Sequence, residues 1–164
     1  LTNSQTLQLN DSAAIVSSTN IWGAAIPTSS VFGAIAGGVA PASTAAVAYC
    51  FASKENFSSI GTYTGNGSAD GPFVNTGFRP ALILVKRTDA ANDWVFYDVK
   101  RNTFNAVDKT LYTNTSAAEG SYSGGDILSN GFKVRYTGGM LNTSGGTYLY
   151  MAFAESPFKT ANAR

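Results

Sequence analysis

Apolar and polar positions alternate along much of this chain, and no segment keeps a helical period of 3.6 residues. In the clearest case, Phe132, Val134 and Tyr136 are expected to face inward, between two basic residues. The predicted strands are Ser30–Ala36, Val47–Ser53, Ala81–Arg87, Asp93–Val99, Phe132–Thr137 and a strand within residues 145–156. Short strands separated by turns predict an all-β fold, an antiparallel β-sandwich or jelly roll with little or no helix.

Two of these segments carry further signals. Ala81–Arg87 is nearly all apolar, which predicts a central strand that is buried on both faces. The dipeptide Asn130-Gly131, just before the alternating strand, indicates a tight turn.

The chain contains an internal repeat. The stretch TLQLNDSAA (Thr6–Ala14) is identical to TLYTNTSAA (Thr110–Ala118) at six of nine positions, with an offset of 104. VAYCFAS (Val47–Ser53) aligns with LYMAFAE (Leu149–Glu155) at an offset of 102. Residues 1–53 are therefore expected to be the C-terminal half of a β module and residues 54–164 a complete β-sandwich module, packed together as one unit. Either a longer parent polypeptide or a half-module that completes the fold explains this arrangement.

The repeat also decides between two readings of PASTAAVAYCFASKE (residues 41–55). Pro41 near its start and its alanines favour a helix when the segment is taken alone. Its counterpart GGTYLYMAFAES follows a double glycine, is rich in aromatic residues and predicts a strand. We therefore predict a strand at Val47–Ser53, with its lone Cys50 as a buried structural thiol.

Charge is scarce and unevenly distributed. Charged residues make up 13% of the chain, its net charge is +1, and residues 1–53 contain a single charged side chain, Asp11. This balance gives no electrostatic basis for binding nucleic acid or an anionic membrane. No apolar run reaches the ~20 residues that span a bilayer, so no membrane insertion is expected. We expect residues 1–53 to be largely covered, by residues 54–156 or by a neighbouring chain.

The glycine-rich stretch YTGNGSADGP (Tyr63–Pro72) is the strongest local signal for a ligand. No lysine follows its glycines, as a phosphate-binding P-loop requires, and its third glycine is one residue late for a dinucleotide fingerprint. Asp70 alone is too few carboxylates for a calcium loop. A sugar-binding turn remains open, and a glycine-permitted turn or bulge is the main prediction.

Candidate catalytic chemistry is sparse. The chain has no histidine, which excludes serine–histidine and cysteine–histidine catalysis and histidine-ligated zinc. Trp22, Trp94, Tyr97 and Tyr136 could stack on sugars, although aromatic residues on strands more often belong to the core. No spacing selects a catalytic pair, and solvated turn and cap acids are expected, among the ten carboxylates Asp11, Glu55, Asp70, Asp89, Asp93, Asp98, Asp108, Glu119, Asp126 and Glu155.

Three long motifs carry a family resemblance. They are FSSIGTYTGNGSADGPFVNTGFRPALILVKRTDAANDWVFYD, AEGSYSGGDILSNGFKVR and NTSGGTYLYMAFAESPFK. Together they resemble the C-terminal β-rich module of tailed-bacteriophage virion proteins, of the tail or fibre type, mostly from marine and cyanobacterial phages. In that family a module ending in an AYCFAE-like strand precedes the YTGNG module. The resemblance carries over no catalytic, cofactor or metal residue.

The resemblance implies a non-enzymatic virion structural module: a tail, fibre or capsid-decoration component that acts through homo-oligomeric assembly. Its expected partners are copies of itself and other virion proteins, and it would be assembled in the host cytoplasm. The alternative is a glycan-binding module of a fibre tip that recognises the host surface through its loops, with Trp94 or Tyr136 exposed. No cofactor is expected for either function.

Overall fold

The computed structural model describes residues 5–18, 28, 30–33, 45, 47–102 and 104–157. Within these residues no helix has the length and apolar character that a membrane crossing requires. The elements are β1 (Gln5–Thr6), β2 (Val16–Ser17), β3 (Ser58–Thr64), β4 (Phe73–Asn75), β5 (Pro80–Arg87), β6 (Val95–Asp98), the 3₁₀ turn η1 (Val99–Arg101), β7 (Val107–Tyr112), β8 (Gly120–Leu128), β9 (Gly131–Val134) and β10 (Thr147–Ala154).

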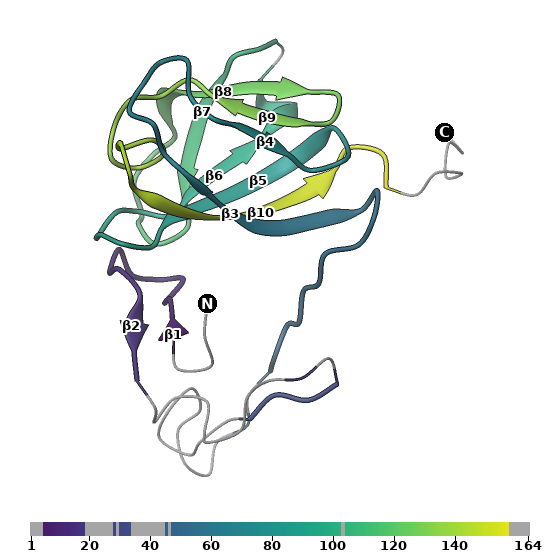
Figure 1. Ribbon diagram of the computed structural model, residues 1–164, viewed down its shortest axis with the longest axis vertical. Helices are drawn as coiled ribbons and strands as arrows, with labels where there is room; N and C mark the ends of the chain where they lie inside the picture. The colour runs from purple at the N-terminus through teal and green to yellow at the C-terminus, as the bar shows by residue number, and fades with distance from the viewer. Residues whose placement is uncertain are drawn as a thin grey trace.

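Eight strands form one antiparallel sheet in the order β3-β10-β5-β6-β7-β8-β9-β4, nearly closed into a barrel. Strands β8, β9 and β4 lie over β3, β10, β5 and β6, so the barrel is sandwich-like (Figure 1). Strand β7 joins the two layers, and a register shift between Val107 and Lys109 marks where it passes from one to the other. The all-β, antiparallel prediction is confirmed.

The core fills the space between the two layers. The first layer contributes residues such as Ile83, Val85 and Tyr148, and the second contributes Phe132 and Val134. The ring of Tyr148 stacks on Tyr63, with ring centroids 5.0 Å apart. Alternate positions of each strand supply these side chains, because side chains of a strand point to opposite faces in turn.

Several predicted strands are confirmed with adjusted bounds. Ala81–Arg87 lies in β5, and Asp93–Val99 contains β6. The strand predicted at Phe132–Thr137 is β9, which begins at Gly131 and ends at Val134, so residues 135–137 lie outside it. The tight turn is confirmed as the two-residue connection between β8 and β9, where Leu128 pairs with Gly131. The last predicted strand is β10.

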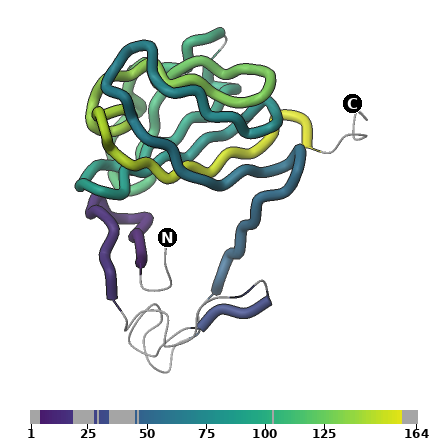
Figure 2. The backbone as a smooth tube through the Cα atoms, viewed as in Figure 1, coloured from purple at the N-terminus to yellow at the C-terminus, as the bar shows by residue number. Residues whose placement is uncertain are grey.

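The N-terminal strand predictions fare differently. Val47–Ser53 forms no strand, and Cys50 is exposed, so both of these predictions are wrong. Residues 30–33 form no strand either, and the rest of Ser30–Ala36 lies outside the described residues. We call residues 47–53 the strap; it leaves the barrel as an extended segment (Figure 2). A strand needs a neighbouring backbone for its hydrogen bonds. Among the described residues, the one β-bridge near the strap joins Lys54 to Ser58, just beyond the C-terminal end of the strap.

The expectation of a covered N-terminal third is wrong for the strap within this chain. Val47, Tyr49 and Phe51 expose 79%, 81% and 58% of their surface. Cover by a neighbouring chain stays a prediction. The earlier part of the segment differs, because Gln8 and Ser12 make hydrogen bonds to the barrel that are described below.

Candidate functional site

The outer face of the sheet carries a continuous apolar row. Register places one residue from each of five neighbouring strands side by side, because Met151 pairs with both Ile60 and Leu84, and the pairing continues through β6 to β7. All five side chains are half-buried. We call them the outer row: Ile60, Met151, Leu84, Phe96 and Leu111.

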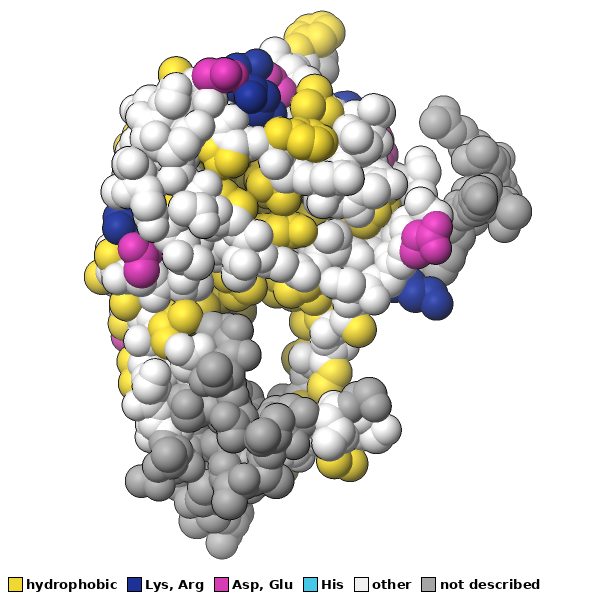
Figure 3. Space-filling model, in the orientation of Figure 1, with side chains coloured by type: hydrophobic (Ala, Val, Ile, Leu, Met, Phe, Trp, Pro, Cys, Tyr) yellow, Lys and Arg dark blue, Asp and Glu magenta, His cyan; other side chains and the backbone are white. Residues whose placement is uncertain are grey.

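More apolar side chains extend this face. Leu82, Leu149 and Phe153 lie on the same side of β5 and β10 as the outer row and are also half-buried. Phe153 makes edge-to-face contacts with Phe51 of the strap and with Phe57. Hydrophobic side chains gather along the lower border of the barrel (Figure 3). The prediction that Ala81–Arg87 is central is confirmed. Burial on both faces is wrong for Leu82 and Leu84, which are half-buried on the outer side, whereas Lys86 on that side is buried.

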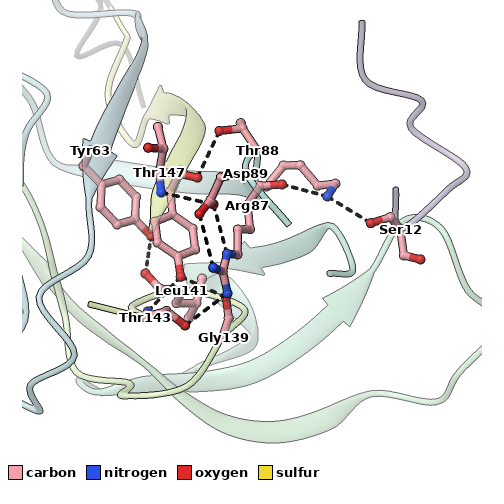
Figure 4. Close-up of polar contacts among 11 residues, drawn as sticks. Ser12, Tyr63, Arg87, Thr88, Asp89, Gly139, Leu141, Thr143 and Thr147 are labelled. Carbon is pink, nitrogen blue, oxygen red and sulfur yellow. Dashed lines mark hydrogen bonds and ion pairs between the residues drawn. The ribbon is translucent and has the colours of Figure 1, made fainter. Parts of the chain in front are cut away.

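One end of this face is covered by residues 8–15, which we call the N-terminal segment. The indole Nε1–H of Trp94 donates to the Gln8 carbonyl at 2.8 Å, and Lys86 Nζ donates to the Ser12 carbonyl at 3.2 Å. Backbone bonds join Ile15 to Thr88 at 2.9 Å and Asn92 to Ser12 at 2.8 Å. Figure 4 shows Ser12 reaching the lysine from a separate stretch of chain.

Lys86 is fully buried, and no carboxylate of the described residues is in hydrogen-bonding contact with it. Its ammonium is satisfied by two carbonyls, those of Ser12 and Arg87. Burial lowers the pKa of Lys86, since desolvation disfavours the charged form. Lys86 thereby joins the N-terminal segment to the sheet, and no signal in the sequence predicts a buried lysine here.

Beside Lys86, an ion pair fixes the adjoining loops. Arg87 Nε lies 3.0 Å from Asp89 Oδ1, and its Nη1 donates to the Thr143 hydroxyl at 3.2 Å. The Arg87 guanidinium lowers the pKa of Asp89. The same carboxylate accepts the Thr147 N–H at the start of β10, so the pair locks two loops at this end of the barrel (Figure 4).

The glycine-rich loop is a turn, as predicted. It connects β3 to β4 and is held by a buried amide, Asn142, whose Oδ1 accepts the Asn66 N–H and whose Nδ2 donates to the Ser68 carbonyl. A Cβ on Gly65 would lie 2.3 Å from the Thr143 carbonyl oxygen. Close backbone approach therefore explains this glycine, and every described polar group of Asn142 is used inside the fold.

Hydrogen-bond or ion-pair donors contact nine of the ten carboxylates, and the tenth, Glu55, is exposed just before β3. Asp70 pairs with Lys133 at 2.9 Å and shares Arg135 with Asp126. The hydrogen bond from Lys133 lowers the pKa of Asp70, the opposite of the raised pKa that a general acid needs. The described residues contain no group of three potential metal ligands. Donor groups also contact Asp11, Asp89, Asp93, Asp98, Asp108, Glu119 and Glu155.

The aromatic candidates for sugar stacking separate clearly. Trp94 and Tyr97 are buried. The sugar-binding alternative expected Trp94 or Tyr136 to be exposed, and this expectation is wrong for Trp94. Trp22 lies outside the described residues. Tyr136 is half-buried and makes an edge-to-face contact with the more exposed Tyr122, with ring centroids 6.4 Å apart.

The outer row was missed at the sequence level. Each member lies on a different strand, and no local sequence pattern indicates which residues of the five strands become neighbours in the sheet. The nearly uninterrupted apolar run of β5 was the one available signal, because a strand with apolar residues on both faces has a second surface to cover.

Comparison with known proteins places the chain in one family. It belongs to the family described as a domain of unknown function, DUF7483, whose model matches residues 1–157. No protein of curated function and no solved structure matches the chain. The family match covers the N-terminal segment and the barrel together and assigns no activity to either.

Proposed function

We propose that this member of the DUF7483 family is a non-enzymatic structural module that assembles with copies of itself through the outer face of its sheet. The observation that carries the proposal is the outer row, five half-buried apolar side chains in register across five strands. Contiguous apolar patches of this kind mark interaction sites on soluble proteins. The low charge of the chain suits a surface that packs against protein.

The chemistry of the described side chains supports the non-enzymatic part of this proposal. The carboxylates with a shifted pKa are all lowered by cationic partners, as in Asp70, Asp89 and Glu155. Lowered carboxyl pKa values are typical of structural ion pairs, whereas acid catalysis needs a raised value. Shape and repeated contact would then be the function of the module.

Sedimentation and light scattering test the assembly surface. We expect the chain to form oligomers at micromolar concentration, and Leu84→Glu to weaken association by at least about thirtyfold, as loss of a central apolar contact does. Ser129→Glu is the control, because Ser129 is exposed in the turn between β8 and β9, in the other layer of the barrel. A chain that stays monomeric at its highest soluble concentration would refute the proposal, as would association that survives Leu84→Glu.

The place of assembly that we propose is the virion of a tailed phage, with other virion proteins as further partners. The three long sequence motifs described above support it, through their resemblance to tail and fibre proteins. Mass spectrometry of purified particles, from a phage that encodes the chain, is expected to detect it in stoichiometric amount. Its absence from the particles, with normal synthesis in infected cells, would exclude a virion role.

A second candidate function is glycan binding on the host surface. The contact between Tyr122 and Tyr136 favours it, because Tyr122 is 45% exposed and presents an aromatic face beside a second ring. A glycan array with the assembled protein tests this function, with Tyr122→Ala as the variant and Phe104→Ala as an exposed aromatic control. Binding lost only in Tyr122→Ala would support it, and binding unchanged in both would locate any sugar site elsewhere.

A further inference from the structure

The hairpin β1–β2 has the same register as β7–β8 at the sequence offset of 104. The pairs are Gln5 with Ser17 and Thr6 with Val16 in the first hairpin, and Lys109 with Ser121 and Thr110 with Gly120 in the second. Adding 104 to each residue number in the pairs of β1–β2 gives the pairs of β7–β8. Register is set by pairing across strands, so this agreement is independent of the sequence identity that first suggested the repeat.

The turns of the two hairpins agree as well. Ala13 N–H donates to Asp11 Oδ1 at 3.0 Å, and Ala117 N–H donates to Thr115 Oγ1 at 3.3 Å. These bonds join equivalent positions, again 104 residues apart, and a hydroxyl replaces a carboxylate as the acceptor. Each is a side-chain bond to the backbone two residues on, which fixes the chain direction as it leaves the first strand.

The strap corresponds to β10 at the offset of 102, but its surroundings are opposite. Strand β10 lies between β3 and β5, and its Ala152 is fully buried. The equivalent Cys50 is exposed, and no described strand flanks it on either side. The strap therefore has the composition of a central strand and the surroundings of a free edge.

We infer that the hairpin β1–β2 and the strap are the open half of a second β module, and that they bind a polypeptide segment with the strand pattern of β3–β6. In the complete module β10 is held between β3 and β5, and β6 lies beside β7. The inferred partner would supply the same neighbours: two antiparallel strands around the strap and one beside β1. A folded second copy cannot do so, because its own β3 and β5 already pair with its β10.

The surface of the strap fits such a partner. Val47, Tyr49 and Phe51 alternate with small residues, so large side chains lie on one side of an extended segment and small ones on the other. In β10 the position equivalent to Cys50 faces the core between Ser59 and Ile83. A partner with the β3–β5 pattern would therefore bury the Cys50 thiol.

The experiment uses Cys50, the single cysteine of the chain, as its own probe. A copy of residues 54–104 is fused directly ahead of Leu1, because the offset of 104 sets Leu1 at the position of Asn105. The labelling rate of Cys50 with a thiol reagent is then measured with and without the fused segment. We expect fusion to slow labelling by at least about a hundredfold, since a buried thiol reacts only when the structure opens locally.

Matched variants make the result specific. A fused segment of the same composition in shuffled order, and one carrying Ile83→Asp in the added copy, are both expected to leave labelling fast. Ala48→Tyr is expected to strengthen protection, because it restores the ring that Tyr150 supplies in the complete module. A further control moves the single cysteine of the chain by combining Cys50→Ser with Ser129→Cys. Labelling then reports on an exposed turn of the barrel, and the fused segment is expected to leave its rate unchanged.

Unchanged labelling of Cys50 in both the plain and the Ala48→Tyr fusions would overturn the inference, as would equal protection by the shuffled segment. Protection that rises with concentration in the unfused chain would also overturn it, because a second copy would then be the partner. The inference does not rest on the assembly proposal. Leu84→Glu in the barrel is expected to change self-association and leave protection of Cys50 by the fused segment intact.

Discussion

The hairpins β7–β8 and β1–β2 share one register and one turn bond, yet their surroundings differ. In β7–β8 the residue Thr110 is fully buried, because β6 and β9 flank the pair. Its equivalent Thr6 is half-buried, and among the described strands β1 and β2 pair only with each other. Local sequence is thus enough to set pairing within a hairpin, whereas burial depends on the neighbours that the rest of the fold provides.

Strand β10 is buried and the strap is exposed, so substitutions in these two segments are predicted to differ most in their effect on the unfolding free energy. Tyr148→Ala removes a fully buried ring that stacks on Tyr63 and whose hydroxyl bonds to Gly139 and Thr143. We expect it to cost about 3–5 kcal/mol of unfolding free energy. Tyr49→Ala, on the exposed strap, is expected to cost less than about 0.5 kcal/mol. Urea denaturation measures both, and similar costs would contradict the contrast.

Larger side chains at two equivalent positions, one in β10 and one in the strap, test the same contrast. Ala152→Leu forces a larger side chain into the closed core and is expected to cost about 1–3 kcal/mol. Cys50→Leu at the equivalent position of the strap is expected to change the unfolding free energy by less than about 0.5 kcal/mol. Thermal denaturation checks this pair. A destabilising Cys50→Leu would mean that the strap is packed in solution.

The two hairpins can be compared in the same way. Thr110→Val removes a hydroxyl that lies 3.3 Å from the Tyr97 hydroxyl and 3.2 Å from the Asp108 carbonyl. We expect a loss of about 1 kcal/mol, the usual net contribution of a buried hydrogen bond. Thr6→Val is expected to stay within about 0.5 kcal/mol of the parent. Chemical denaturation of both variants tests the pair, and a greater loss for Thr6→Val would reverse the interpretation.

The smallest expected effect depends on pH. Hydrogen bonds from Lys100 and Arg79 hold the pKa of Glu155 below its ordinary value of 4.5, and the strap has the uncharged Ser53 at the equivalent position. A carboxyl whose pKa is lowered by folding stabilises the fold above its ordinary pKa, and this stability is lost as the pH falls through the lowered value. Both partners are partly exposed, so the effect is under about 1 kcal/mol.

Glu155→Gln is the variant that isolates this effect. It is expected to lower stability slightly at neutral pH and to match the parent once the pH has fallen below the lowered pKa of Glu155, where both side chains are uncharged. Denaturation curves across the acid range give the comparison. A difference that persists unchanged at low pH would assign the effect to packing instead of charge.

Much of the barrel was predictable because its signals are local. The alternation around Phe132 and Val134, the tight turn before them and the aromatic strand near the C-terminus each set a strand without reference to distant residues. The glycine-rich stretch could be identified as a turn because its spacing fits no phosphate or metal motif. The repeat, with its offset of 104, is likewise a property of the sequence alone.

Tertiary structure decided what those elements meet. The outer row exists only because five strands are in register, and Lys86 is buried only because Ser12 and its neighbours lie over it. The strap has the sequence of a strand but not its structure, since a strand takes its hydrogen bonds from adjacent backbone and no described strand flanks it. Sequence determined the local conformation of the barrel strands, and non-local pairing determined which faces are covered.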